Sequence, residues 1–472
     1  MKSKFLYPFI IIVLLGFLAS PAVAQSSAIS NSVQNSTAAQ SPMLAPSQLK
    51  THGPLINTLV FKVYSSEQDA FQALLSGQIQ GMEWSLTPSM YTTALTTPGV
   101  YANVTTSYAF DGIAFNCLMY PYSNVHFRRA IAYLVNYAYL QSLYGVAAVA
   151  EPYLYEPTLF SPPYASTYWY DPNLPYPYKY DPEMAMKELL EVPGMAYNNV
   201  TGQWTLYGKP FSPVLYYRSD DPLRTELAIA LESAAQQINL SITLKPVTGV
   251  TASSVIYSPA ASVVIAPGTM LSNFSTTPPQ FNMTLANETD TWGMYTFGWI
   301  VSWEPNYPWF FFNGQLAGIV DFGNFWNESM DYWTDILYWG ATNLSVAQHA
   351  AWMVQEIYDQ QLPYVIAFWS NQIYADYVKG WTGFAQLPTT GPNKGIGLYY
   401  TALNVHPSNV SYGGTYTEAL QSAPTSLNPL YYINWVWQVD VWQEVYDSPI
   451  GTPPWGLTNG SLIPWMGTYS VQ

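Results

Sequence analysis

Residues 58–84 carry the pattern of a strand, a helix and a second strand, and this order constrains the fold more than any other feature. Thr58 to Tyr64 is an apolar and β-branched run typical of a strand. Ser66 is a suitable N-cap for a helix whose apolar residues recur at helical spacing, and Gly77 is a typical stop. Ile79 to Trp84 then predicts a returning strand. A unit this short predicts a parallel or mixed sheet.

The same alternation continues along the chain. Four further helices are marked by capping residues or by apolar spacing: Val125–Leu140 after Asn124, a helix opened by Asp181 and Pro182, Arg224–Ile238, and a helix capped by Ser345 that runs to Gln361. Ile242–Lys245 and Tyr364–Trp369 predict strands. Because strands and helices alternate throughout, the predicted fold class is α/β.

Composition limits the function. The chain has 472 residues, which predicts more than one core. Only 9% of residues are charged, so few groups titrate, and this suits an acidic external medium. The net charge is −15 and no Lys/Arg cluster occurs, which argues against nucleic-acid binding. A single cysteine, Cys117, rules out an internal disulfide, and the scattered histidines show no metal-ligand spacing. We therefore expect neither a metal nor a cofactor.

The N-terminus has the features of a secretory signal. Lys2 and Lys4 precede an apolar run from Phe5 to Leu18, and Ala22-Val23-Ala24 predicts cleavage before Gln25. An uncleaved anchor helix is the alternative. N-x-[ST] triplets spread along the chain agree with a secreted glycoprotein on the outer face of the cell membrane. Residues 25–50 are rich in Ser, Gln and Pro and predict a disordered spacer.

Four segments together resemble a known family. They are residues 59–84, 112–137, 180–190 and 218–247, and within the second the matching positions are Asn116, Asn124, Arg128 and Ala130. In this order they resemble the family 5 solute-binding proteins, the peptide, oligosaccharide and nickel receptors of ABC importers. The resemblance implies a two-lobe, periplasmic-binding-protein type II (Venus flytrap) fold that closes around a ligand. It also implies a partner permease, with ATP used by a separate subunit.

The C-terminal part of the chain departs from the family's usual order. Residues 413–450 resemble the segment that normally stands near the N-terminus, so the arrangement resembles a circular permutation. The strand-rich stretch that should follow is missing, which predicts a truncated copy or one part of a longer protein, with an incomplete first lobe. The expected division is a signal peptide at 1–24, the spacer at 25–50, first-lobe parts at 51–108 and 381–472, and the second lobe at 109–380.

Residues 297–314 are the richest candidate for the ligand site. They resemble the family's cleft segment, with Gly298 and Trp299 on its motif and Ser302 at the position of an acid that binds a peptide's amino terminus. Glu304 is a possible substitute. Loss of the fixed acid favours a neutral oligosaccharide stacked on aromatic rings, with an oligopeptide as the alternative. The predicted ligand-binding residues are Trp299, Ser302, Trp303, Glu304, Asn306, Trp309, Asn116, Tyr432 and Trp435.

Several of these candidates also have a structural interpretation. The tryptophans are typical of a core and Asn116 of a turn, and Arg128 of the family motif is typical of a structural ion pair. The sequence therefore predicts a monomeric binding protein, not an enzyme, whose partners are a small-molecule ligand and an ABC permease. The alternatives are a secreted glycoside hydrolase, a surface-layer or adhesion glycoprotein, and a truncated remnant without function.

Overall fold

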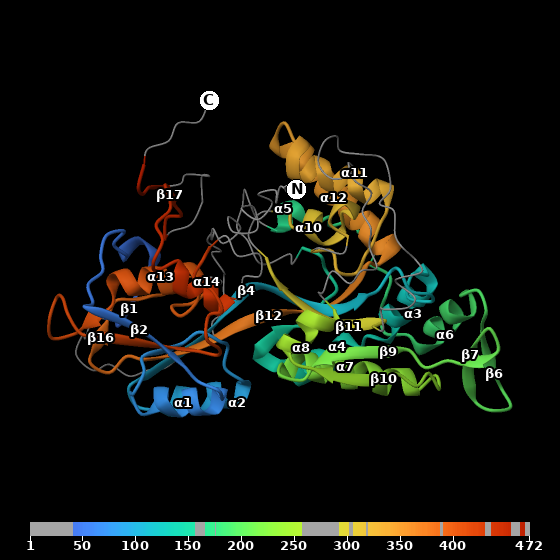
Figure 1. Cartoon of the computed structure of the whole chain (residues 1–472), viewed down its shortest axis with the longest axis horizontal. Coiled ribbons are helices and arrows are strands. Elements are labelled where there is room, and N and C mark those ends of the chain that lie inside the picture. The colour runs from blue at the N-terminus through green and yellow to red at the C-terminus, as the bar shows by residue number, and fades with distance from the viewer. Residues whose placement is uncertain are drawn as a thin grey trace, which may run out of the picture.

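The computed structural model describes residues 41–155, 166–174, 176–256, 292–301, 305–317, 320–387, 390–429, 436–454 and 463–467. The sheets of this part of the chain form two lobes, on the left and right of Figure 1, that share two long strands. The predicted signal peptide and spacer residues 25–40 lie outside the described residues. Spacer residues 41–50 are described, and Met43 is buried against Phe384 in a short parallel pair. Order therefore begins earlier than the composition predicted.

Lobe one is built on a parallel sheet in the order β2-β16-β3. The strands are β2 (Thr58–Val63), β16 (Thr415–Leu420) and β3 (Gly81–Met82), and α1 (Glu67–Leu75) connects β2 to β3. The Ser66 hydroxyl accepts the Asp69 N–H at 3.3 Å, and Gly77 has a positive φ of 75°, as the sequence predicts for the two ends of α1. The strand–helix–strand unit is thus present, but β16 lies between its two strands.

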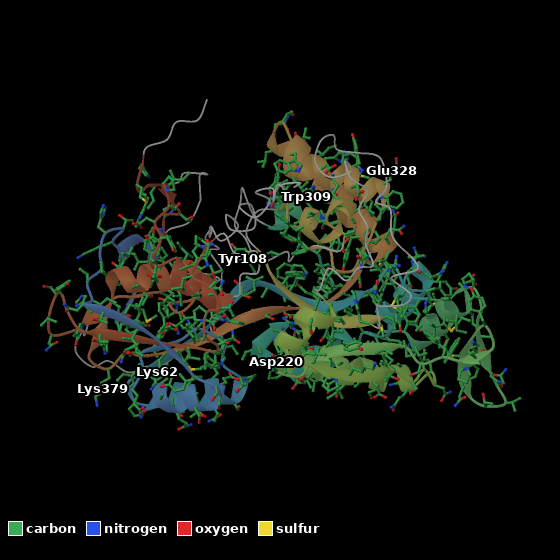
Figure 2. The ribbon with its side chains drawn as sticks, in the orientation of Figure 1. Lys62, Tyr108, Asp220, Trp309, Glu328 and Lys379 are labelled. Atoms are coloured by element: carbon green, nitrogen blue, oxygen red, sulfur yellow. The ribbon has the colours of Figure 1, made fainter. Side chains whose placement is uncertain are left out.

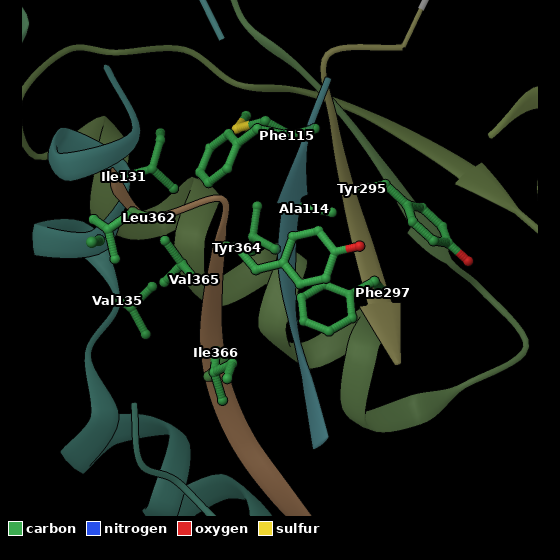
Figure 3. Packing of buried hydrophobic residues seen from close by; sticks show 14 of the residues in the cluster. Ala114, Phe115, Ile131, Val135, Tyr295, Phe297, Leu362, Tyr364, Val365 and Ile366 are labelled. Atoms are coloured by element: carbon green, nitrogen blue, oxygen red, sulfur yellow. The ribbon is translucent and has the colours of Figure 1, made fainter. Parts of the chain in front are cut away.

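Lobe two contains a six-stranded sheet in the order β10-β9-β11-β4-β12-β5. The strands are β10 (Thr243–Val247), β9 (Val214–Arg218), β11 (Met294–Ile300), β4 (Val100–Phe115), β12 (Tyr364–Tyr377) and β5 (Ala148–Val149). Phe297 and Tyr364, from strands on either side of β4, place their rings 4.3 Å apart in the core (Figure 3). Such buried aromatic surface stabilises the lobe.

Strands β4 and β12 run through both lobes as one antiparallel pair (Figure 1). Their register extends from Tyr364 opposite Ala114 in lobe two to Tyr377 opposite Val100 in lobe one. It shifts between Ser370 and Asn371, midway along the pair. The apolar run predicted a strand only to Trp369, because the pattern changes where the strand leaves the core of lobe two. This pair is the covalent and hydrogen-bonded connection between the lobes.

Helices cover both faces of each sheet (Figure 1). In lobe one α1 and α2 (Pro88–Thr96) cover one face, and α13 (Gly395–Asn404) and α14 (Val436–Trp442) the other. In lobe two the helices are α3 (Val125–Leu134), α4 (Tyr137–Tyr144), α6 (Pro182–Leu190) and α7 (Pro222–Gln236) on one face, and α10 (Pro308–Phe312), α11 (Glu328–Asp335) and α12 (Leu344–Gln361) on the other.

The remaining elements are short. They are β1 (Met43–Leu44), η1 (Pro46–Gln48), η2 (Gly145–Ala147), α5 (Ser166–Trp169), β6 (Met195–Asn198), β7 (Gln203–Leu206), β8 (Lys209–Pro210), α8 (Gly249–Val255), η3 (Gly314–Leu316), η4 (Ile336–Gly340), β13 (Trp381–Thr382), β14 (Phe384–Ala385), β15 (His406–Pro407), β17 (Ile450–Gly451) and β18 (Ile463–Pro464). No helix among the described residues has the length and apolar run needed to cross a membrane.

Several helix boundaries differ from the prediction for one physical reason. The predicted helix 125–140 is two helices, because the Asn136 side chain caps the second by accepting the Tyr139 N–H at 3.0 Å. Asn343, not Ser345, caps α12, and Asp221 caps α7 before the predicted start at Arg224. In each case a short Asn or Asp side chain satisfies a free backbone N–H and so sets the boundary.

Candidate ligand site at the lobe junction

The carboxyl ends of the parallel strands in both lobes point to the junction of the lobes. Along the antiparallel β4–β12 pair, β11 runs toward lobe one and ends with Ile300 opposite Ala109. In lobe one, β3 runs toward lobe two, since the chain just beyond it places the Leu86 N–H 2.8 Å from the Ile373 carbonyl. The neighbouring parallel strands follow the same directions. Ligands of open α/β sheets bind beyond the carboxyl ends of strands, which makes this junction the candidate site.

A polar network joins three elements at this junction. The Arg224 Nε donates to Asp111 Oδ1 at 2.7 Å and lies 3.1 Å from Asp221 Oδ2, while the Ser370 hydroxyl donates to Asp111 Oδ2 at 2.8 Å. Burial raises the pKa of Asp111 to about 6, although Arg224 acts in the opposite direction. Gly298 passes so close that a Cβ there would collide with both Arg224 and Asp111. The network fixes α7, β4 and β12 together where β12 changes register.

Lobe one contacts the start of α7 directly. Leu223 packs against the apolar clusters of both lobes. Glu67, the first residue of α1, has its pKa raised to about 7 by burial and then by the negative charge of Asp221. Beside them, Arg218 Nε lies 2.6 Å from Asp220 Oδ1, and Asp220 Oδ2 accepts an N–H of α8 at 3.0 Å (Figure 2). The junction is therefore lined by charged side chains at the starts of three helices.

Residues 50–316 match the family model described as "Bacterial extracellular solute-binding proteins, family 5 Middle". The chain belongs to this family. That result and the α/β architecture confirm the predicted family and its two-lobe, type II fold class. No curated protein matches the chain.

Solved structures of other family 5 proteins share the fold at low sequence identity. NikZ from Campylobacter jejuni, in complex with Ni(L-His), is 17% identical with a TM-score of 0.54, covering 70% of this chain and 57% of that one. The oligopeptide-binding protein AppA from Bacillus subtilis, in complex with a nonapeptide, is 15% identical with a TM-score of 0.55, covering 72% of this chain and 58% of that one. A periplasmic oligopeptide-binding protein from Thermotoga maritima, bound to mannohexaose, is 16% identical with a TM-score of 0.56, covering 73% of this chain and 61% of that one. This family 5 chain thus spans 57–61% of the length of these three proteins.

Two of the predicted ligand residues have structural roles inside lobe two. Trp309 is 3% exposed, stacks on Tyr338 with ring centroids 4.5 Å apart, and donates its indole N–H to Asp335 Oδ1 at 2.8 Å (Figure 2). Asn116 is fully buried, and its side chain donates to a carbonyl and accepts the Leu118 N–H at 3.2 Å. Both side chains are occupied within the lobe, which agrees with the core and turn interpretations.

Trp299 lies closer to the junction. It is half-buried near the end of β11, and its ring stacks on Phe311 with centroids 4.7 Å apart. Asn306 is half-buried and its carbonyl accepts the Trp309 N–H at 3.1 Å. The other predicted ligand residues lie outside the described residues: Ser302, Trp303, Glu304, Tyr432 and Trp435. Of the described candidates, Trp299 is therefore the one on the strand end that faces lobe one.

Among the described residues Arg128 has no ion-pair partner, unlike the structural ion pair predicted for it. Its guanidinium donates to the carbonyls of Gln361, Tyr122 and Ser123 at 2.7–3.1 Å. The five donors of a guanidinium suit this task, because they can satisfy several buried carbonyls at once. Arg128 thus connects the start of α3 to the end of α12 through hydrogen bonds.

The sequence prediction missed Asp111 and Arg224. The available signal was Asp111 itself, an isolated acid in the apolar run "YAFDGIAF" of a chain with 9% charged residues. An acid in such a run must be paired when buried, but its partner is 113 residues away and cannot be read from the pattern. Within the described residues, no group of three or more His, Cys, Asp and Glu side chains could hold a metal ion.

Proposed function

We propose that this chain is a ligand-capturing receptor of an ABC importer, acting outside the cell membrane and delivering its ligand to a membrane permease. The observation that carries the proposal is the junction, where the parallel strands of the two lobes direct their carboxyl ends at each other along the β4–β12 pair. Two lobes joined by such a pair move relative to each other by small changes at the shared strands. A ligand that contacts both lobes then favours the closed arrangement through its higher affinity for that arrangement.

We further propose that the ligand is an oligosaccharide, with an oligopeptide as the alternative. Ser302 stands where peptide-binding members resembling this chain have an acid, so a charged amino terminus lacks its partner. Trp299 offers an aromatic ring near the junction, and sugars stack on such rings. A protein of the same fold has been solved with mannohexaose, which supports this ligand class.

The test is intrinsic tryptophan fluorescence of the full chain, titrated with mannohexaose and with a short neutral peptide. Closure around Trp299 should shift the emission at micromolar ligand. Trp299→Phe should remove most of the shift, whereas Trp339→Phe, an exposed tryptophan of lobe two, should leave it unchanged. A response to peptide alone would refute the sugar preference and point to Glu304 as the acid. Absence of any response to both ligands would refute the receptor proposal, and release of shorter sugars would show a hydrolase.

A further inference from the structure

A pocket of about 520 Å³ lies in lobe one, apart from the junction. Its walls come from residues 51–54, from α13, from the residues that follow α14, and from the β18 region. None of the loops that follow β2, β3, β16, β9, β10 or β11 contributes a lining residue. The pocket is therefore separate from the candidate ligand site described above.

Two aromatic rings and a carboxylate are fixed together at this pocket. The rings of Tyr399 and Trp465 have centroids 5.6 Å apart at an angle of 55°. The Trp465 indole N–H donates to Asp447 Oδ1 at 2.9 Å, which holds the carboxylate beside the indole. An indole face attracts cations through its quadrupole, so a ring and a carboxylate held together favour a positively charged group.

Glu444 adds a second carboxyl group to the same pocket. Its Oε1 atom is buried and has no hydrogen-bond partner among the described residues. Burial, and then the negative charge of Asp440, raise the pKa of Glu444 to about 8. The lining residues include no lysine or arginine that could neutralise either carboxylate. A buried, unpaired carboxyl takes up a proton or a cation, and here a cavity is open to it.

We propose that this pocket binds an organic ammonium ion, with the cation held by Glu444 and Asp447 and packed against the ring of Trp465. The positive charge of the ammonium group neutralises the two carboxylates, and its alkyl groups contact the aromatic rings. The site is independent of the receptor proposal, because it uses none of the residues at the lobe junction.

The proton on Glu444 gives this site a characteristic pH dependence. A cation competes with that proton, so binding should strengthen as pH rises from 6 to 9 and should release a proton near pH 8. The charged and titratable groups that line the pocket with Glu444 are Asp447, Tyr446, Tyr399 on α13 and His52, and Asp440 lies one helical turn before Glu444.

The experiment is isothermal titration calorimetry of the full chain at pH 8.5 with choline, compared with its neutral isostere 3,3-dimethylbutan-1-ol. Choline should bind at least tenfold more tightly than the isostere, and its affinity should fall at least tenfold at pH 6. Glu444→Gln and Trp465→Leu should each weaken choline binding at least fivefold. The matched control Glu356→Gln, an exposed residue on α12, should not.

Equal binding of choline and the isostere would overturn the proposal, since the pocket would then be only apolar. So would choline binding that is unaffected by pH, or no choline binding to the unmodified chain. These comparisons use the natural sequence and do not depend on whether a variant folds. In the variants, an unchanged melting temperature would show that the chain remains folded.

Discussion

Asp359 makes the stability of this protein depend on pH in a direction opposite to that of most carboxyls. The side chain lies near the end of α12, is 8% exposed, and has one carboxyl oxygen without a partner among the described residues. Burial raises its pKa from 3.8 to about 7. The difference of about 3 units corresponds to roughly 4 kcal/mol of differential stability between the protonated and ionised forms.

The direction of the pH dependence follows from the raised pKa of Asp359. The unfolded chain ionises Asp359 near pH 3.8, whereas the folded chain keeps it protonated up to about pH 7. The stabilising contribution is therefore fully present below about pH 4 and is lost as pH rises through about 7. We expect the free energy of unfolding to decrease by up to about 4 kcal/mol across this interval on account of this one group.

Urea denaturation at pH 4 and pH 8, on the natural chain and on Asp359→Asn, measures this effect. Asparagine does not titrate, so the variant should lose about 4 kcal/mol of the pH-dependent difference, whatever its absolute stability. Asp69→Asn, at an exposed position of α1, is the matched control and should keep the full difference. If Asp359→Asn shows the same change between the two pH values as the natural chain, the assignment of a protonated, buried Asp359 is wrong.

Three further predictions concern buried groups. Asp376 and Glu418 are fully buried in lobe one, and burial raises both pKa values. Raising the pH above the ordinary pKa range of a carboxyl should therefore destabilise lobe one and speed the amide hydrogen exchange of β16. The double variant Asp376→Asn, Glu418→Gln should reduce this dependence of the exchange on pH. Arg128→Met should lower the free energy of unfolding by about 3 kcal/mol or more in urea, because three carbonyls lose their donor, and full stability in that variant would contradict the role given to Arg128. Gly112→Ala should lower the melting temperature, because a Cβ on this residue of β4 would collide with the Val365 carbonyl of β12. An unchanged melting temperature would show that β4 and β12 can move apart at this point without loss of stability.

At the candidate site, the sequence does not distinguish buried aromatic residues from those near the lobe junction. Of residues 297–314, the strand β11 ends at Ile300 beside the lobe junction, and the role of this segment in ligand binding stays a prediction. The sequence could not tell Trp299 from Trp309, because both are aromatic residues in one apolar segment. Packing separates them: α10 buries Trp309 against Tyr338, while the strand leaves Trp299 half-exposed.

The local elements and the family can be read from the amino-acid sequence without the structure. Ser66, Asn124 and Asp181 each accept a backbone N–H two or three residues later, so the start of each helix depends on neighbours in the chain and can be read directly. The ordered family segments similarly identified the fold, which the match over residues 50–316 confirms.

Which distant segments meet depends on the folding of the whole chain. It places β16 between β2 and β3, although about 330 residues separate β16 from β3, and it pairs Asp111 with Arg224. Strand neighbours and buried ion pairs depend on how the whole chain excludes water from its cores, and several arrangements satisfy the same local pattern. The lobe junction exists because of those long-range contacts, and no short stretch of the sequence contains it.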